Sequence, residues 1–219
     1  MNEKLKVWGI LGGVSLLTIS LIYLFSKPKK RKSKFKSKLI SIANEEYDAW
    51  NTNGKIKEGN KDTIQRLRDY WEEGTGTKAN DDYYVNTAWS SAFISYLMKK
   101  AGAGDDFKYS PLHSEYIRQA IKNRKQKNSI KIKGYKPNEV DVKAGDLVCY
   151  PRQSGVNYDT TSGYMSHCDL VVSTNEKQAV TIGGNVSDSV TKTIVPLKNG
   201  KIDMSKENKG YFVVIKNDK

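Results

Sequence analysis

The stretch from Ala88 to Gly102, AWSSAFISYLMKKAG, constrains the fold more than any other part of the chain. Its large apolar side chains recur at helical spacing and form one face: Trp89, Phe93, Tyr96 and Leu97. Two lysines in the last turn, followed by Gly102, are typical of a helix C-terminus. The sequence therefore predicts a helix with Ser90 in its first turn. Free backbone N–H groups at that position stabilise negative charge.

Helical and strand patterns occupy different halves of the chain. Amphipathic helices are expected at 36–50 and 61–73, the Ser90 helix follows, and a further helix runs from a cap at Ser110 to about Asn123. From Gly145 the pattern alternates, and strands are expected at 146–150, 167–173, 179–183, 191–196 and 211–216. The segments 74–86 and 124–143 are expected to lack regular structure. This order favours an α+β fold with N-terminal helices packed on a small antiparallel sheet.

A long apolar run near the N-terminus predicts a membrane anchor. Val7 to Phe25 is uncharged and long enough to span a bilayer as a helix. A signal peptide is the competing interpretation, but no small-x-small cleavage site follows, which favours an uncleaved anchor. The expected organisation is an N-terminal flank at 1–6, the transmembrane anchor at 7–25, a basic juxtamembrane segment at 26–38 and one domain at 39–219.

Positive charge is concentrated next to this run. Lys27 to Lys38 contains eight Lys or Arg in twelve positions, and the whole chain has a formal charge of +13. The segment is expected to lie on anionic lipid headgroups or to be a solvated flank. It lacks the interleaved aromatic residues of a nucleic-acid surface, so no nucleic-acid partner is expected. The charge bias places the C-terminal domain in the cytoplasm.

Four short motifs carry a family resemblance in their order along the chain. They are W-S-S-A-F at 89–93, G-D-L-V at 145–148, S-H-C-D-L-V-V at 166–172 and G-G-N-V-S-D-S-V at 183–190. Together they resemble the motifs of CHAP and NlpC/P60 amidases and peptidases. An uncharacterised bacterial branch with W-S-A-A-F is most similar, since it also has a Y-W pair (70–71) and an S-x-x-H-x-x-Y-I segment (110–117).

This resemblance covers roughly residues 40–216 and implies a papain-like fold that hydrolyses peptidoglycan peptides in bacteria or phages. Ser90 stands where the catalytic relatives have cysteine, and it is the expected nucleophile. His167 is the expected base. A cell-wall hydrolase would face the wall, which conflicts with the charge bias, so the side of the membrane stays open.

The strand register suggests a partner for His167. A turn at 174–178 would place opposite each other Leu170 and Ile182, Val172 and Val180, Asp169 and Gly183, and His167 and Asn185. A carboxamide opposite an imidazole can hold its ring and tautomer, so Asn185 is the expected orienting residue. Substrate contacts are expected from Trp89, His113, Arg152 and Asp169. For His113, a capping or packing role is an alternative.

The two cysteines, Cys149 and Cys168, lie on neighbouring expected strands. They are either small buried side chains or a disulfide, which would favour an extracytoplasmic domain. No C-x-x-C spacing, phosphate-binding glycine loop or dinucleotide fingerprint occurs, so neither a metal nor a cofactor is expected.

Three functions fit these features. The first is a membrane-anchored hydrolase of peptidoglycan peptides or related amides that uses Ser90, His167 and Asn185. The second is an inactive relative that binds wall fragments or a protein partner, and the third is a membrane-tethered module that binds through its basic segment. A serine hydroxyl ionises less readily than a thiol, which favours the second. The expected His–Asn pair favours the hydrolase, which we adopt.

Overall fold

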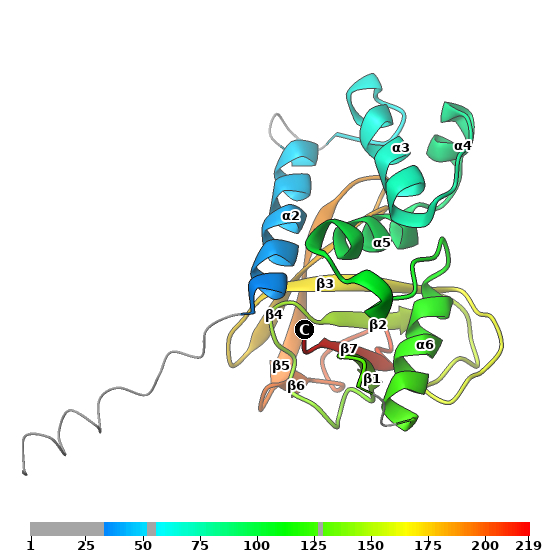
Figure 1. The fold of residues 1–219 in the computed structure, drawn as a ribbon. Helices are drawn as coiled ribbons and strands as arrows, with labels where there is room; N and C mark the ends of the chain where they lie inside the picture. The colour runs from blue at the N-terminus through cyan, green and yellow to red at the C-terminus, as the bar shows by residue number, and fades with distance from the viewer. Residues whose placement is uncertain (1–32, 52–55, 127–128) are drawn as a thin grey trace, which may run out of the picture. The chain divides into compact units, whose positions relative to one another are not determined.

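Helices precede strands in the computed structural model, which describes residues 33–51, 56–126 and 129–219 (Figure 1). The helices are α2 (Lys34–Asn51), α3 (Lys61–Thr75), α4 (Asp81–Asn86), α5 (Ser90–Ala101), the 3-10 turn η1 (Gly104–Asp106) and α6 (His113–Lys125). The strands are β1 (Ile132–Tyr135), β2 (Leu147–Pro151), β3 (Ser166–Thr174), β4 (Gln178–Gly183), β5 (Thr191–Lys198), β6 (Lys201–Ile202) and β7 (Val213–Asn217). The expected α+β class is confirmed.

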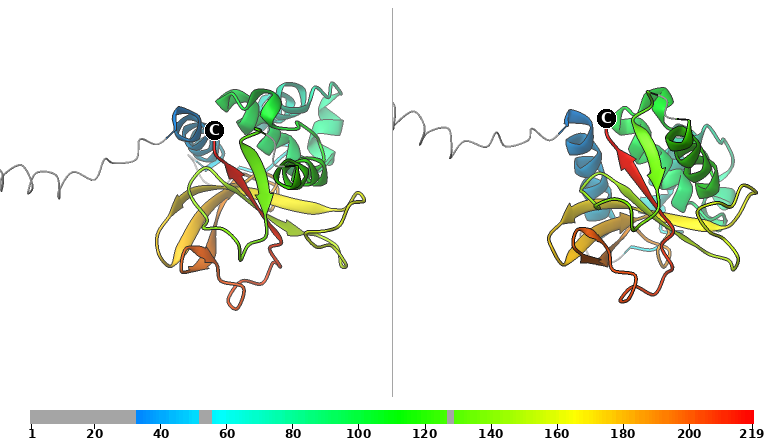
Figure 2. Two further views of the ribbon diagram at one scale, coloured as in Figure 1. Left: turned by 60° about the horizontal axis from the view of Figure 1, so that its bottom comes forward. Right: turned by 90° about the horizontal axis from the view of Figure 1, so that it is seen from below.

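The strands form one curled antiparallel sheet in the order β1-β7-β2-β3-β4-β5-β6. Figure 2 shows the helices gathered on one side of this sheet. The larger core cluster joins the helices to that side and includes Trp50, Leu67 and Phe93 with Leu170 and Ile182 of the sheet. A smaller cluster lies on alternate strand positions, among them Val148, Val171 and Val214. The helical half and the sheet therefore share a continuous core.

Local signals explain both the elements that were predicted and those that were missed. Gly102 ends α5 with a φ of 93°, as expected from the sequence. The expected loop at 74–86 contains α4, where the Asn80 side chain caps the Tyr83 N–H. The expected irregular segment at 124–143 contains β1, which pairs with β7. Both missed elements are short, and a sequence pattern is weakest for short elements.

The register between β3 and β4 is the predicted one over part of its length. Leu170 pairs with Ile182 as expected, but a bulge follows and Val180 lies opposite Ser173 instead of Val172. A bulge inserts one residue into one strand, so a constant register cannot describe the hairpin. β4 ends at Gly183, two residues before Asn185.

Cys149 and Cys168 lie opposite each other on β2 and β3 and form a disulfide. Both are fully buried in the cluster that contacts the helices. His167 and Asp169 occupy the alternate positions of β3, because successive side chains of a strand point to opposite faces. The disulfide that the sequence left open is therefore formed. It joins β2, which ends one residue before Arg152, to β3, in which His167 is the second residue.

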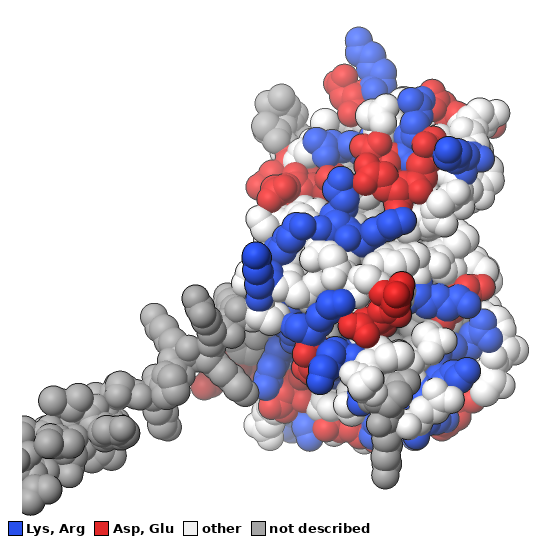
Figure 3. All heavy atoms as spheres, viewed as in Figure 1, with Lys and Arg blue, Asp and Glu red and all other residues white. Residues whose placement is uncertain are grey.

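Charges of both signs are intermixed on the face shown in Figure 3. Several form exposed ion pairs on the helices, such as Arg68 with Asp81 and Lys100 with Glu73. Exposed pairs of this kind are screened by water and contribute little to stability. The buried clusters are therefore the larger source of stability.

The compact unit extends from Ser33 to Lys219, six residues beyond the expected boundary at 39. Phe35 is buried, and Lys36 reaches the buried Asp146 with its ammonium group at 3.4 Å. The expected span Val7–Phe25 lies outside the described residues. Within the described ranges, no helix has the length and apolarity needed to cross a bilayer. The end of the basic segment is therefore part of the folded unit.

A chain that begins at Ser33 is expected to fold, whereas one that begins at Leu39 should be markedly less stable. The shorter chain loses the first turn of α2, the burial of Phe35 and the contact between Lys36 and Asp146. Burial of one such aromatic side chain contributes about 1.5–3 kcal/mol. Thermal unfolding followed by circular dichroism should give a midpoint lower by roughly 5 °C or more for the shorter chain. Equal midpoints would show that residues 33–38 add nothing to the thermal stability of the domain.

Candidate active site

Ser90 is the first residue of α5, and its hydroxyl makes a buried contact with a histidine. The N-cap residue Trp89 makes no side-chain capping bond, and the Ser90 Oγ lies 2.7 Å from His113 Nε2. Ser90 is only 9% exposed. The first backbone N–H groups of a helix lack intrahelical partners and carry partial positive charge. The Ser90 hydroxyl therefore combines a hydrogen-bonded imidazole with an environment that stabilises an anion.

Two serines in the first two turns of α5 hold the segment that precedes His113. The hydroxyls of Ser91 and Ser95 donate to the Ser110 carbonyl at 2.9 Å and 3.1 Å, and the Ser110 N–H donates back to Ser95 at 3.2 Å. α6 then begins at His113. These bonds fix the start of α6 against the start of α5, which brings the imidazole to Ser90.

Tyr116 lies behind His113 on the same face of α6. Residues three apart on a helix are neighbours, and the Tyr116 hydroxyl is hydrogen-bonded to His113 Nδ1. Both side chains are nearly completely buried. A neutral imidazole that donates from Nδ1 to Tyr116 has its lone pair at Nε2, facing Ser90. Burial raises the pKa of Tyr116 well above its ordinary value, so the phenol stays protonated.

His113 is a weak base for a histidine. Burial lowers its pKa well below the ordinary value, and charge on His167 and Arg152 lowers it further. The imidazole is therefore neutral at pH 7. A neutral imidazole at 2.7 Å from a hydroxyl is the protonation state that can accept the hydroxyl proton.

A second histidine lies next to the first and is paired with a carboxylate. The rings of His113 and His167 are 5.2 Å apart between centroids, and His167 Nε2 lies 2.9 Å from Asp169 Oδ1. Burial by itself would raise the Asp169 pKa. The adjacent His167, then Lys209 and Arg152, outweigh it and hold the pKa below its ordinary value. Asp169 is therefore an ionised group at the back of the site.

Gly183 on β4 leaves room for this pair. A Cβ atom at Gly183 would lie 1.9 Å from Asp169 Oδ1 and 3.1 Å from His167 Nε2. Any side chain there would displace the carboxylate from the imidazole. The glycine is therefore required by close packing against the His167–Asp169 pair.

Two expected contacts are made by other residues. Within the described chain, the hydrogen bond expected between Ser90 and His167 is made to His113 instead. Asp169, two residues along the same strand, takes the Nε2 contact of His167 that was expected from Asn185. Asn185 lies beyond the end of β4 with a φ of 54°, so the ladder that was to place it opposite His167 stops short.

Trp89 is placed in the core, where it cannot contact a substrate. It is fully buried and stacked on Trp50 with 5.0 Å between ring centroids, and its Nε1 donates to Glu58. Its packing fixes the residue just before Ser90. Arg152, by contrast, is exposed and reaches His167, with its Nη2 3.2 Å from His167 Nδ1.

A family model covers all of these residues. The family described as "Uncharacterized protein conserved in bacteria (DUF2272)" matches residues 46–214. The chain belongs to this family. The searches of curated proteins and of solved structures each returned no match. Ser90, His113 and His167 all lie inside the family domain, which therefore contains the whole candidate site.

Sequence reasoning missed Tyr116 and Lys209 as members of the site. Tyr116 has a detectable signal, since it lies three residues after His113 at the start of an amphipathic helix. Lys209 lies in the connection between β6 and β7, with its ammonium group 4.0 Å from Asp169 Oδ2. No pattern around Lys209 indicates that contact, because it depends on how the loop folds back.

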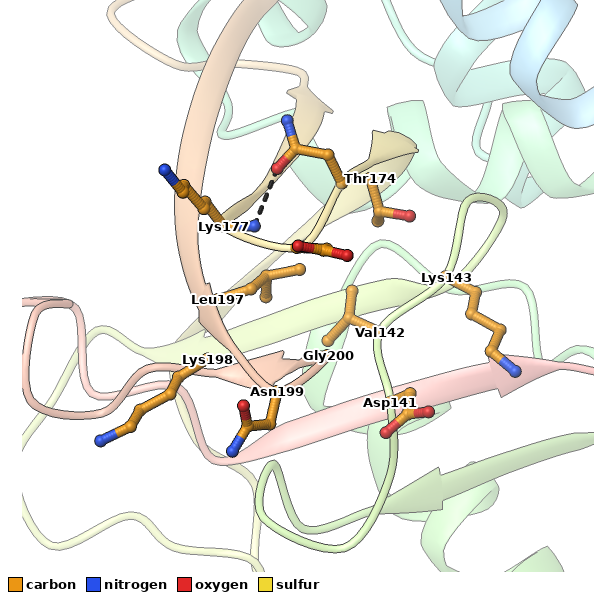
Figure 4. Close-up of a pocket in the computed structure, with 11 residues that line it drawn as sticks. Asp141, Val142, Lys143, Thr174, Lys177, Leu197, Lys198, Asn199 and Gly200 are labelled. Carbon is orange, nitrogen blue, oxygen red and sulfur yellow. Dashed lines mark hydrogen bonds between the residues drawn. The ribbon is translucent and has the colours of Figure 1, made fainter.

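One cavity away from the candidate site shows no comparable chemistry. A cavity of about 850 Å³ lies between the β3–β4 turn, the β5–β6 turn and residues 141–143. Its lysines, Lys143, Lys177 and Lys198, point in three different directions (Figure 4). Within residues 33–51, 56–126 and 129–219, no three His, Cys, Asp or Glu side chains are arranged to hold a metal ion.

Proposed function

We propose that this protein is a serine hydrolase of peptidoglycan peptides or related amides, built on a papain-like domain with Ser90 in the position of the cysteine. The observation that carries this proposal is the 2.7 Å contact between the Ser90 hydroxyl and the neutral His113 at the start of α5. Acyl transfer needs a nucleophile, a base and a group that stabilises an oxyanion. Ser90, His113 and the start of α5 supply these three components. The order of the sequence motifs supports the same reaction class.

The proposed first step is attack of Ser90 Oγ on the amide carbonyl carbon. His113 Nε2 takes the hydroxyl proton, while its Nδ1–H is held by Tyr116. The first-turn N–H groups of α5 stabilise the oxyanion. The C–N bond then breaks, and the departing amine takes the proton from His113. Water hydrolyses the resulting ester by the same steps.

His167 and Asp169 support this step by holding the surroundings of His113 in place. The His167 ring lies beside that of His113, with 5.2 Å between centroids, and its Nε2 lies 2.9 Å from Asp169 Oδ1. The carboxylate therefore fixes the ring against which His113 packs. We assign the pair this positioning role.

The disulfide supports placement of the domain outside the cytoplasm. Disulfides persist in oxidising compartments and are rare in reducing ones. The buried pair Cys149–Cys168 therefore favours the cell-wall side, where peptidoglycan lies, over the side indicated by the charge bias. We propose that Val7–Phe25 anchors the domain to the membrane from that side.

An inactive binding domain is the second candidate, and burial favours it. Ser90 is 9% exposed, His113 5% and His167 0%, so a substrate reaches the hydroxyl only after neighbouring groups move. A domain that only binds has no need of an exposed nucleophile. The labelling experiment below separates the two candidates.

A fluorophosphonate probe is expected to label Ser90, with a rate that stays high in mild acid. The base acts only when neutral, and the lowered His113 pKa keeps it neutral below pH 6.5. The rate should fall only as the pH drops through that lowered pKa. Mass spectrometry of the labelled peptide between pH 4 and 9 measures the rate.

A companion measurement keeps unfolding separate from titration. In the unfolded chain His113 binds a proton near pH 6.5, whereas in the folded chain it resists one, so stability decreases as the pH falls below 6.5. Circular dichroism at each pH identifies the range in which the domain stays folded. A labelling rate that falls to half its maximum above pH 7, while the domain is still folded, would contradict the assignment of His113 as base. Absence of labelling would favour the binding domain.

A further inference from the structure

Arg152 lies at the candidate site and pairs with no carboxylate of the described chain. The guanidinium groups of Arg66, Arg68 and Arg124 each pair with a carboxylate, and that of Arg118 donates to the Ser114 and Thr161 carbonyls. For Arg152, no carboxylate of the described chain lies within 4.0 Å, and its Nη2 instead donates to His167 Nδ1 at 3.2 Å. A guanidinium presents a planar fork of donors that fits a carboxylate with two bonds. Bonds to one ring nitrogen and to the Tyr150 hydroxyl leave part of that fork for a carboxylate.

The surroundings of Arg152 add a second positive charge. Lys209 has its ammonium group 4.7 Å from the centre of the Tyr150 ring and 4.0 Å from Asp169 Oδ2. Tyr150 in turn packs on His167 with 5.2 Å between ring centroids. Two cations and one carboxylate, Asp169, thus surround this end of the site. With Asp169 ionised, the side chains of Arg152, Lys209 and Asp169 together carry one net positive charge.

One oxygen of that carboxylate has no hydrogen-bond partner. Asp169 Oδ1 is taken by His167, whereas Oδ2 is buried and unpartnered within the described chain. Lys209 is close enough to neutralise Asp169 without forming a short bond. Lys209 and Arg152 both lower the Asp169 pKa, so the two cations share one carboxylate, and Arg152 is the one that is exposed to solvent.

We propose that Arg152 recognises a carboxylate on the substrate and moves from His167 to that carboxylate when the substrate binds. The exchange replaces one bond to a ring nitrogen with a charge-assisted pair. It also leaves His167 Nδ1 without its arginine donor. The substrate class is an amide or peptide with a free carboxylate close to the scissile bond.

Recognition of a carboxylate by Arg152 rests on the proposed hydrolase function, but it is measured as binding and needs no turnover. The full chain is labelled with nitrogen-15 in histidine and arginine, and side-chain resonances are followed during titration with N-acetylglycine. The His167 Nδ1 resonance is expected to move toward its position in unliganded Arg152→Gln. Arg152→Gln should bind N-acetylglycine at least tenfold more weakly than wild type.

Matched probes and variants decide the outcome. N-acetylglycinamide, which lacks the carboxylate, should bind at least tenfold more weakly than N-acetylglycine. Arg68→Gln, an exposed arginine on α3, should bind like wild type. Equal binding of the neutral amide, wild-type binding by Arg152→Gln, or tighter binding of inorganic phosphate would each overturn the proposal. Ser90→Ala should keep the carboxylate response, so a failure of catalysis would leave this result intact.

Discussion

Ser90→Ala should lower amide turnover by a factor on the order of 10⁴ to 10⁶, with only a modest loss of stability. The alanine removes the attacking oxygen and leaves the oxyanion environment of the helix start. It also leaves the buried His113 Nε2 without its 2.7 Å partner, which costs about 1–3 kcal/mol. Release of free amines from purified peptidoglycan measures turnover, and thermal unfolding measures stability.

Variants of the two histidines test which of them is the base. His113→Gln keeps an amide that can bond to Ser90 but cannot take a proton, so its loss should match that of Ser90→Ala. His167→Gln should cost less, roughly 10- to 100-fold, because His167 acts through His113. The double variant Ser90→Ala/His113→Gln should be no worse than either single one, since the two residues act as a unit.

Opposite results would change the mechanism in defined ways. A total loss in His167→Gln with activity retained in His113→Gln would return the role of base to His167, as the sequence motifs imply. Ser90→Cys should retain activity, because a thiol ionises more easily next to an imidazole. Wild-type turnover in Ser90→Ala would leave only the binding domain.

Asp146→Ala should destabilise the domain by about 3–5 kcal/mol, the largest stability effect that we expect from one side chain. Asp146 is fully buried and accepts from the ammonium groups of Lys216 and Lys36 and from the Lys143 N–H. Its removal leaves Lys216, itself nearly buried, without a counter-charge. The melting temperature should fall by roughly 10 °C.

Asp159→Ala is the matched control for that experiment. Asp159 also pairs with two lysines, Lys125 and Lys136, but its side chain is 63% exposed. Water screens such a pair, so its loss should cost at most about 1 kcal/mol. Urea unfolding of both variants measures the difference. Equal effects would show that burial of Asp146 adds nothing to its ion pairs.

Patterns of apolar residues predicted most of the fold. The helical face of α5 and the alternation in β3 and β4 are strong signals, because each buries a whole row of side chains against the core. Trp50, Tyr70 and Trp71 lie in the amphipathic helices expected at 36–50 and 61–73, and each is at most 1% exposed. The start of α2 was placed two residues too late, and the domain boundary at 39 left Lys36 in the charged flank, whereas Lys36 contacts Asp146.

The site was harder to predict because it depends on how elements meet. Ser90 and Arg152 were identified from motif and position, and the structure brings both next to the two histidines. The exchange of His167 for His113 at Ser90 follows from the bonds of Ser91 and Ser95 to Ser110, which no periodic pattern encodes. Asn185 does not lie opposite His167 on the sheet as predicted, because β4 ends at Gly183, and where a strand ends depends on the turn that follows it.

The disulfide makes the segment 149–168 a covalently closed ring. Its two ends are neighbouring strands, and the ring contains both Arg152 and the long connection that leads to His167. Within that ring the connection is anchored to the domain, because Tyr158 and Tyr164 are buried in the larger core cluster and the Tyr158 hydroxyl donates to the Gly134 carbonyl. Reduction would remove the covalent link between β2 and β3 and leave their backbone ladder. An assay in reducing buffer would then measure a candidate site whose two strands are held together by that ladder and by packing.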